Sequence, residues 1–376
     1  MIRKYALLSF IVLFTFCKKE PKVDQKLKTS VIQNDYAKGF EVMDYGEFKV
    51  LHITNPWPNA DITYKYALLP EGKQLPDSVS VNTTISVPLE KIVVTSTTHI
   101  PALEALGVEK QLVGFPNTNY VSSEKTRQLI DQGAVKELGK NESINTEVLL
   151  KLKPDAVVGF AVDGNNKTFN TIEKSGIPVL FNADWTEGHP LGKAEWIKFF
   201  GYLFGKEKEA QEIFKKIAND YNEAKELAAT IQNNPTVLSG AMYKDVWYLP
   251  HGDSWAAQFI QDAGGQYLWS ETKGSGSIDL NFEQVLVKVK LADFWIAPGS
   301  SESKAELLER NEHYAQFDAF KNGKIYNFAE KKGATGGLLY YELAPNRPDL
   351  ILKDMIKIMH PEVLPDYDLY FYSKLN

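Results

Sequence analysis

The strongest candidate for covalent chemistry is Ser254, in the segment HGDSWAAQ (251–258). The segment lacks the second glycine of the glycine-x-serine-x-glycine turn that exposes a nucleophilic serine. A nucleophilic serine also needs a base and a group that orients the base. His360 follows Asp354 by six residues, which is not the spacing expected of such a pair. We therefore expect Ser254 or its neighbour Asp253 to cap the helix that follows.

The histidines show no spacing typical of a metal-binding helix. They are His52, His99, His189, His251, His313 and His360. A zinc or manganese site assembled in space from His99, His251 and a carboxylate remains an alternative. Cys17 is the only cysteine, so neither a disulfide within the chain nor a cysteine-based metal site is expected. The prediction is therefore no resident metal and no cofactor.

Aromatic side chains on predicted loops are better candidates for binding than for catalysis. Several of them follow predicted strands, at the end of a parallel sheet where ligands bind. Aromatic surfaces with a few polar groups favour a large, flat or amphipathic ligand, and an arginine can pair with an anionic group on it. The glycine loops 273–277 and 332–337 match neither a P-loop nor a dinucleotide fingerprint and are expected to line a cleft. The predicted ligand-binding residues are His99, Tyr120, Trp185, Trp247, His251, Trp255, Tyr340, Tyr341 and Arg347.

Alternating strand and helix patterns predict the elements that position these residues. Repeated βα units favour mainly parallel sheets covered by helices. Residues 206–231 are amphipathic and contain no glycine or proline, which predicts one helix of about 39 Å. Asn145 and Glu147 recur as Asn281 and Glu283 with the same spacing, so the two halves are expected to be related. The predicted fold class is α/β: two βα lobes with mainly parallel sheets joined by one long rigid helix, plus a small N-terminal β-rich extension.

The chain is expected to divide into seven parts, and the second to be a flexible tether because it is polar and low in aromatic residues. The third is expected to be a small antiparallel element, because short β-type runs alternate with turn signals. The parts are a signal peptide with a lipobox (1–17), the tether (18–35), the β-rich extension (36–88), an N-lobe (89–190), helices that include the interlobe helix (191–234), a C-lobe (235–330) and a C-terminal helical segment (331–376).

The first residues predict export and lipid anchoring. Arg3 and Lys4 precede an apolar run, 5–16, which is shorter than the roughly 20 residues that span a membrane and is typical of a secretory signal. Cys17 ends this run and resembles the acylated cysteine of bacterial lipoproteins, although Phe16 is larger than the residues usual before it. We expect Cys17 to carry a lipid; an uncleaved anchor or a buried N-terminal helix is the alternative.

The composition and net charge of the chain limit the classes of partner that it can bind. The chain has 48 acidic and 42 basic residues, a net charge of −6 and a pI near 5.7. No basic stripe is present to bind phosphates, so nucleic acid is excluded as a partner. About 360 residues exceed what one hydrophobic core supports, which favours two lobes or domains.

An ordered series of segments resembles the class III periplasmic binding proteins. These are receptors for ferric siderophores, haem and cobalamin that feed ABC importers. The segments are EKIVVTSTTHIPALEALGVEKQLVGF, NTEVLLKLKPDAVVG, SWAAQFIQDAGGQYLW, LNFEQVL and FDAFKNGKIYNF. They cover roughly residues 88–330, and the resemblance implies two α/β lobes joined by one rigid helix, which the predicted helix 206–231 matches.

The resemblance also implies roles for single residues. In that family a surface glutamate on each lobe docks onto arginines of the permease, and the matching residues are Glu147 and Glu283. The alternative is that both only favour the dipole of their helix. Cobalamin receptors place a tryptophan just before the first glutamate, and ELGKNESINTE has none, so a ferric siderophore or related iron chelate is expected ahead of haem or cobalamin.

The resemblance thus implies a substrate-binding lipoprotein of an ABC importer, without enzymatic activity. Its expected partners are an ABC permease with its ATPase, a small-molecule iron complex and, through a lipid anchor, the membrane. The expected state is a monomer at the periplasmic or cell-surface face. A zinc or manganese receptor and a secreted serine hydrolase using Ser254 are the rival hypotheses.

Overall fold

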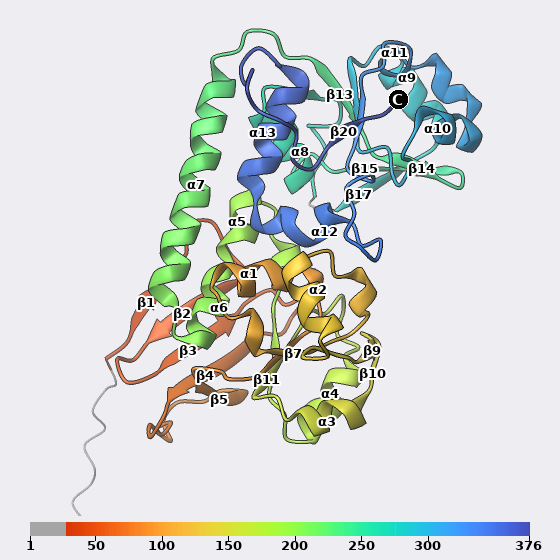
Figure 1. The fold of residues 1–376 in the computed structure, drawn as a ribbon. Helices are drawn as coiled ribbons and strands as arrows, with labels where there is room; N and C mark the ends of the chain where they lie inside the picture. The colour runs from red at the N-terminus through yellow and green to blue at the C-terminus, as the bar shows by residue number, and fades with distance from the viewer. Residues whose placement is uncertain (1–27, 275) are drawn as a thin grey trace, which may run out of the picture.

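One long helix joins the two lobes of the protein. The computed structural model describes residues 28–274 and 276–376. In it, α7 (Glu207–Ala229) runs along one side of the molecule from the lower lobe to the upper lobe (Figure 1). Its buried stripe packs on α5 (Pro190–Glu195) and α6 (Ile197–Phe204) at one end and on α8 (Trp255–Asp262) at the other. The helix thus lies where the pattern over 206–231 predicts it.

The N-lobe contains a parallel five-stranded sheet with the order β12-β11-β6-β7-β8. Its central strands are short, apolar and buried on both faces, as expected for a sheet covered by helices. The strands are β6 (Ile92–Val94), β7 (Leu112–Phe115), β8 (Lys136–Glu137), β11 (Ala156–Gly159) and β12 (Val179–Phe181), and the helices α1 (Ile100–Ala105), α2 (Glu124–Asp131), α3 (Thr146–Leu152) and α4 (Lys167–Lys174).

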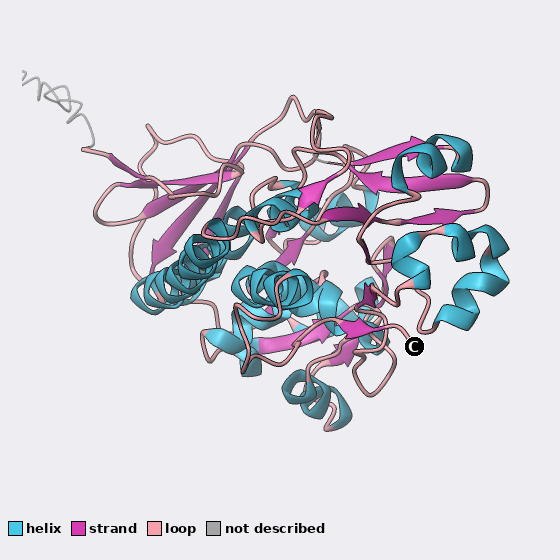
Figure 2. Cartoon of the chain, turned by 90° about the horizontal axis from the view of Figure 1, so that it is seen from above, coloured by secondary structure: helices cyan, strands magenta, loops and turns pink. Residues whose placement is uncertain are grey.

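The C-lobe repeats this arrangement with the order β16-β13-β18-β19-β20, in which only the β19–β20 pair is antiparallel. In the view from above (Figure 2) the strands form separate groups with helices packed around them. The strands are β13 (Thr236–Ser239), β16 (Gln266–Tyr267), β18 (Phe294–Ile296), β19 (Ile325–Asn327) and β20 (Ser373–Lys374), and the helices, besides α8, are α9 (Phe282–Val289), α10 (Lys304–Arg310) and α11 (Asp318–Lys321). The predicted fold class is confirmed in both lobes.

The C-lobe also carries a separate antiparallel sheet of β14 (Ala241–Tyr243), β15 (Val246–Pro250) and β17 (Ser277–Leu280). The sequence pattern predicted continued βα alternation here. Strands β14 and β15 instead form a hairpin, with Lys244 in the left-handed region at φ 55° between them. A two-residue connection of this kind joins antiparallel neighbours and cannot join parallel ones.

The N-terminal extension is a five-stranded sheet that begins earlier than predicted. Its strands are β1 (Ser30–Ile32), β2 (Phe40–Asp44), β3 (Lys49–Ile53), β4 (Tyr64–Pro70) and β5 (Thr83–Val87). Strands β1 to β4 are antiparallel as predicted, whereas β5 pairs with β4 in parallel. The prediction of a tether over 18–35 is therefore wrong for residues 30–35, because β1 is hydrogen-bonded into the sheet. The predicted signal peptide and Cys17 lie outside the described residues.

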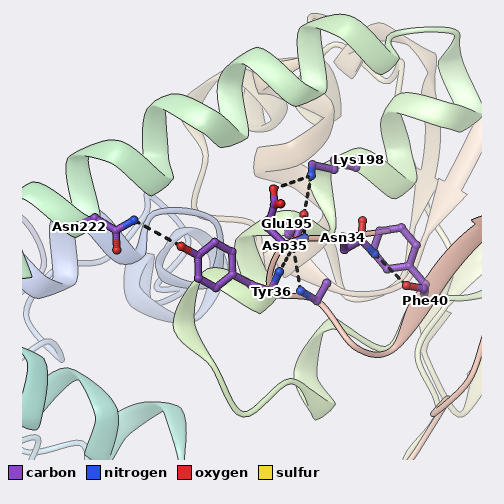
Figure 3. Close-up of polar contacts among 8 residues, drawn as sticks. Asn34, Asp35, Tyr36, Phe40, Glu195, Lys198 and Asn222 are labelled. Atoms are coloured by element: carbon purple, nitrogen blue, oxygen red, sulfur yellow. Dashed lines mark hydrogen bonds and ion pairs between the residues drawn. The ribbon is translucent and has the colours of Figure 1, made fainter. Parts of the chain in front are cut away.

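Residues 34–39, which we call the N-terminal strap, are held by a buried carboxylate (Figure 3). Glu195 is 0% exposed and accepts hydrogen bonds from the backbone N–H groups of residues 35, 36 and 37 at 2.9, 2.7 and 2.8 Å. Lys198 neutralises it as an ion pair. The hydroxyl of Tyr36 accepts a hydrogen bond from Asn222 of α7 at 3.4 Å. The strap thereby ties the N-terminal sheet to the interlobe helix.

The C-terminal segment returns from the C-lobe to the N-lobe. Residues 331–347, which we call the C-terminal bridge, include the short helix α12 (Leu339–Leu343). The Thr335 hydroxyl donates to the carbonyl of Asn119 and the Asn346 amide to that of Thr98, each at 2.8 Å. Helix α13 (Pro348–Met359) then packs along α7. The lobes are thus connected twice. No helix in the described residues has the length and hydropathy needed to cross a membrane.

Replacing Glu195 by Ala is expected to destabilise the protein by about 3–5 kcal/mol, because it leaves three backbone N–H groups without their acceptor and the buried Lys198 ammonium with only its longer pair to Asp35, at 3.6 Å. Urea unfolding of the two proteins measures the difference. Glu212→Ala, an exposed change on α7, is the matched control. Equal unfolding midpoints for Glu195→Ala and the parent protein would contradict the role given to this carboxylate.

Candidate ligand-binding site

A cavity opens at the carboxyl ends of the N-lobe strands and is closed from above by the C-terminal bridge. It measures ≈ 330 Å³. Residues 95–97 after β6 and 115–117 after β7 line one side, and Gly337, Leu338 and Tyr341 of the bridge line the other. A second cavity of ≈ 310 Å³ adjoins it and shares three lining residues, Asn141, Glu142 and Phe160. The position is the one where open α/β sheets bind ligands.

Two predicted residues, Tyr120 and Tyr341, meet at this cavity. Both side chains remain largely exposed, at 65% and 59%, although one comes from the N-lobe and the other from the bridge. Glu137 fixes the loop that carries Tyr120 by accepting from the N–H groups of Asn117 and Thr118 at 3.0 and 2.8 Å. Burial acts to raise the pKa of Glu137, but hydrogen bonds from the Thr118 hydroxyl and from these backbone N–H groups lower it overall. Two phenol faces are therefore held ready to contact a ligand.

Three more predicted aromatic residues gather around Lys193 of α5. The Lys193 ammonium donates to the carbonyl of Trp185 at 2.9 Å and lies 5.2 Å from the centre of the Trp255 ring. Trp255 packs against Tyr340 with ring centres 6.2 Å apart. Burial lowers the pKa of Lys193 to about 8. Trp185, at 38% exposed, remains accessible, whereas Tyr340 is 7% exposed and supports the bridge from inside.

Three other predicted residues do not reach the cavity. Trp247 is 0% exposed and packs against Trp295 in the C-lobe core, so it offers no surface to a ligand. His99 is also 0% exposed, and burial lowers its pKa to about 4, which keeps it neutral at neutral pH. Arg347 forms a two-point ion pair with Asp349 at 2.9 and 2.7 Å and lines a different cavity, between α1 and α7. The predicted ligand contact is therefore wrong for Trp247 and His99, which have no exposed surface, and stays a prediction for Arg347.

The chemistry of Ser254 is that of a helix cap. Its hydroxyl accepts from the N–H group of Ala257 at 3.2 Å and donates to the carbonyl of His251 at 2.6 Å. The side chain is 2% exposed. His251 is half-buried on the C-lobe, and its ring lies against Gly274. Within residues 28–274 and 276–376, no three histidines or carboxylates come close enough to hold a metal ion, so the site imagined from His99 and His251 does not form.

Several lining residues were missed by the sequence analysis. Thr95, Ser96 and Thr97 follow the buried run of β6, so the rule that ligands bind at strand ends could have found them. Asn141 and Glu142 lie on the tip between β9 (Gly139–Lys140) and β10 (Ser143–Ile144). No sequence pattern marks this small hairpin, because its strands have two residues each.

The two predicted docking glutamates occupy equivalent positions in the two lobes. Glu147 and Glu283 are exposed in the first turn of α3 and α9, which lie toward opposite ends of the molecule (Figure 1). Asn145 caps α3 by accepting from the third N–H group at 3.1 Å, and Asn281 caps α9 in the same way at 2.9 Å. The internal similarity of the sequence thus corresponds to a repeated helix start.

A sequence model described as "Periplasmic binding protein" matches residues 92–331. The chain belongs to the periplasmic binding protein family. Two curated relatives are lipoproteins by name. The uncharacterized lipoprotein MJ0878 of Methanocaldococcus jannaschii is 26% identical over 94% of this chain and 87% of its own length. The uncharacterized ABC transporter substrate-binding lipoprotein YvrC of Bacillus subtilis is 20% identical over 67% and 76%.

Solved structures share the fold of this periplasmic binding protein. A possible iron-binding (periplasmic solute-binding) protein from Staphylococcus epidermidis aligns with a TM-score of 0.57 and 17% identity, over 73% of this chain and 99% of that one. A periplasmic heme binding protein from Pseudomonas aeruginosa aligns with a TM-score of 0.57 and 19% identity, over 77% and 98%. The chain is thus a substrate-binding protein of the ABC-transporter type, and lipid anchoring at the periplasmic or cell-surface face agrees with the names of the relatives.

The bridge of this periplasmic binding protein lies almost wholly beyond the matched range and is latched to the N-lobe by Glu342. Its carboxylate is 2% exposed and accepts from the N–H groups of Ser122 and Ser123, at the start of α2, at 2.7 and 2.8 Å. Burial raises the pKa of Glu342 to about 7, and the nearby carboxylate of Glu104 adds to the rise. The two hydrogen bonds oppose this rise but do not cancel it.

The pKa of Glu342 predicts how stability depends on pH. Because the folded protein holds this proton more tightly than the unfolded chain, the free energy of unfolding should fall as pH rises from about 4.5 to about 7, by on the order of 3 kcal/mol. In Glu342→Gln this contribution should vanish. Urea unfolding at a series of pH values gives both slopes, and their difference isolates Glu342 because His99 titrates in both proteins. Identical slopes would refute the assignment.

Proposed function

We propose that this protein captures an iron chelate, a ferric siderophore, between its lobes and delivers it to an ABC permease with its ATPase. The observation that carries the proposal is the cavity at the carboxyl ends of β6 and β7, where Tyr120 and Tyr341 face the same space from two parts of the fold. Aromatic and apolar lining with a few polar groups suits a chelate, whose organic shell is partly apolar. No bond of the ligand is made or broken in this role.

The double connection between the lobes supports capture in a largely preformed cavity. Helix α7 and the C-terminal bridge both cross from one lobe to the other. A movement of one lobe relative to the other would have to deform both connections, which is harder than bending a single loop. Little conformational ordering therefore has to accompany ligand binding. Pre-organisation of this kind favours affinity by lowering the entropic cost of association.

Haem and cobalamin are the alternative ligands. The similar structures include an iron-binding and a haem-binding protein by title, at equal TM-scores, so similarity of fold does not choose between them. The propionates of haem call for a cationic partner, and the predicted one, Arg347, is paired with Asp349 at another cavity. A ferric siderophore therefore stays ahead of haem, and cobalamin follows. A zinc or manganese receptor has no ligand set in the described residues.

Delivery would use the exposed glutamates and the anchor. Among the described residues, Glu147 pairs only with Lys151 of its own helix, at 2.7 Å, and keeps 80% of its side chain exposed. It can exchange this weak surface pair for a permease arginine at small cost. Glu283 presents the same position on the other lobe. Acylation of Cys17 would hold the receptor near that permease.

The ligand class is tested by titrating the purified protein with ferric siderophores, haem and cobalamin while tryptophan fluorescence is followed. We expect saturation with a siderophore, and an affinity about 5-fold weaker in Tyr120→Ala or Tyr341→Ala, because one aromatic contact is worth about 1 kcal/mol. Tyr370→Ala, an exposed change outside the cavity, should bind normally. Failure of every siderophore to bind would rule out the proposed ligand class.

The docking role is tested by replacing Glu147 and Glu283 together with Ala. Uptake of the labelled chelate into cells should be lost, while the Kd of the purified protein stays unchanged, because neither residue lines the cavity. The control is a double change of two exposed glutamates elsewhere, Glu124→Ala with Glu309→Ala. Normal uptake by the Glu147 and Glu283 double variant would leave these residues only a helix-dipole role.

A further inference from the structure

The charges around the cavity limit which chelate it can accept. Among the residues that line the ≈ 330 Å³ cavity, Glu142 is the only carboxylate, and neither lysine nor arginine is present. The adjoining cavity adds Asp163 and Lys167, so two carboxylates and one ammonium line the pair. An anion placed in the first cavity would meet Glu142 with no cation among the residues that line that cavity, because the one ammonium, Lys167, lines the adjoining cavity. Bringing an anion next to a carboxylate that is not compensated is costly.

Two uncharged polar groups in the lining can each accept a hydrogen bond from a ligand. The Thr95 hydroxyl belongs to a residue that is 5% exposed, and it has no hydrogen-bond partner within the described chain. The Asn141 side-chain oxygen is likewise buried and without a protein partner. Both residues line the cavity. Together with Glu142 they favour a ligand that brings hydrogen-bond donors.

Two lysines outside the lining of the cavities are held by other contacts. Lys193 donates to the carbonyls of Asp184 and Trp185 at 3.1 and 2.9 Å. Lys332, at the start of the glycine loop of the bridge, forms an ion pair with Glu302. The exposed faces of Tyr120 and Tyr341 add partial negative charge, which attracts cations. The hydrogen-bonding groups and the charges of the lining therefore both favour a ligand that is not an anion.

We propose that the cavity is selective for neutral or cationic ferric chelates, such as trihydroxamates, and rejects anionic ones, with Glu142 as the residue that senses ligand charge. The proposal rests on the proposed function and refines it. Three hydroxamates, each a monoanion, neutralise Fe³⁺, and a pendant amine makes the complex a cation. Three catecholates, each a dianion, leave it strongly negative. The two chelate classes thus differ in net charge, which is the property that the lining discriminates.

The test measures Kd by equilibrium dialysis of the full-length protein with three iron-loaded probes. They are a linear trihydroxamate with a free amine, the same compound with its amine acetylated, and a tris-catecholate. We expect the tris-catecholate to bind at least ~10-fold more weakly than either hydroxamate. Glu142→Gln should reduce the preference for the amine form over the acetylated form by ~3-fold or more, and the exposed control Glu309→Gln should not change it.

The outcomes separate this inference from the function on which it rests. A tris-catecholate that binds as tightly as the hydroxamates overturns the charge selectivity and leaves the iron-chelate receptor standing. An unchanged amine preference in Glu142→Gln, with a thermal unfolding midpoint equal to that of the parent, overturns the role of Glu142. Absence of binding by all three probes overturns both the proposed function and this inference.

Discussion

Buried backbone N–H groups outside helices and sheets must find acceptors, and this protein supplies them with buried carboxylates. Glu195 binds three consecutive N–H groups of the N-terminal strap, and Glu187 binds the next two, at 2.9 and 2.8 Å. Glu342 holds the start of α2, and Asp354 holds residues 370–372 of the tail. Glu195, Glu187 and Glu342 join segments about 150 to 220 residues apart in the sequence, and Glu342 in particular fastens the C-terminal bridge to the N-lobe.

The arrangement of lobes followed from patterns that act locally. Short apolar runs alternating with helical repeats identified the parallel sheets and α7, because a strand buried on both faces is apolar throughout and a half-buried helix is apolar every three to four residues. The start of the N-terminal sheet and the β14–β15 hairpin were misjudged. Strand β1 is short and exposed, so its pairing leaves no trace in the apolar pattern, and the hairpin is decided by the backbone conformation at Lys244.

The residues of the candidate site were predicted only in part, because residue type does not separate side chains that bind a ligand from side chains that pack in the core. Residue type indicated that Tyr120 and Tyr341 could bind a ligand, but the same argument selected Trp247 and His99, which lie in the core. Aromatic side chains serve both roles, and only the packing of distant elements separates them. Arg347 pairs with Asp349, two residues away, and lines a different cavity, which residue type alone does not indicate. The cavity residues Asn141 and Glu142 depend on a hairpin too short to recognise.

The strap also determines how a tethered receptor would be loaded mechanically. It is fastened to α5 and to Asn222 on α7, and β1 lies beside the foot of that helix (Figure 1). A force applied to the chain before β1 would be transmitted to α7. It would not act directly on the cavity or on the first turns of α3 and α9, which carry Glu147 and Glu283. A lipid anchor attached before the strap would therefore raise the local concentration of the receptor near a membrane partner without loading the residues that shape its cavity.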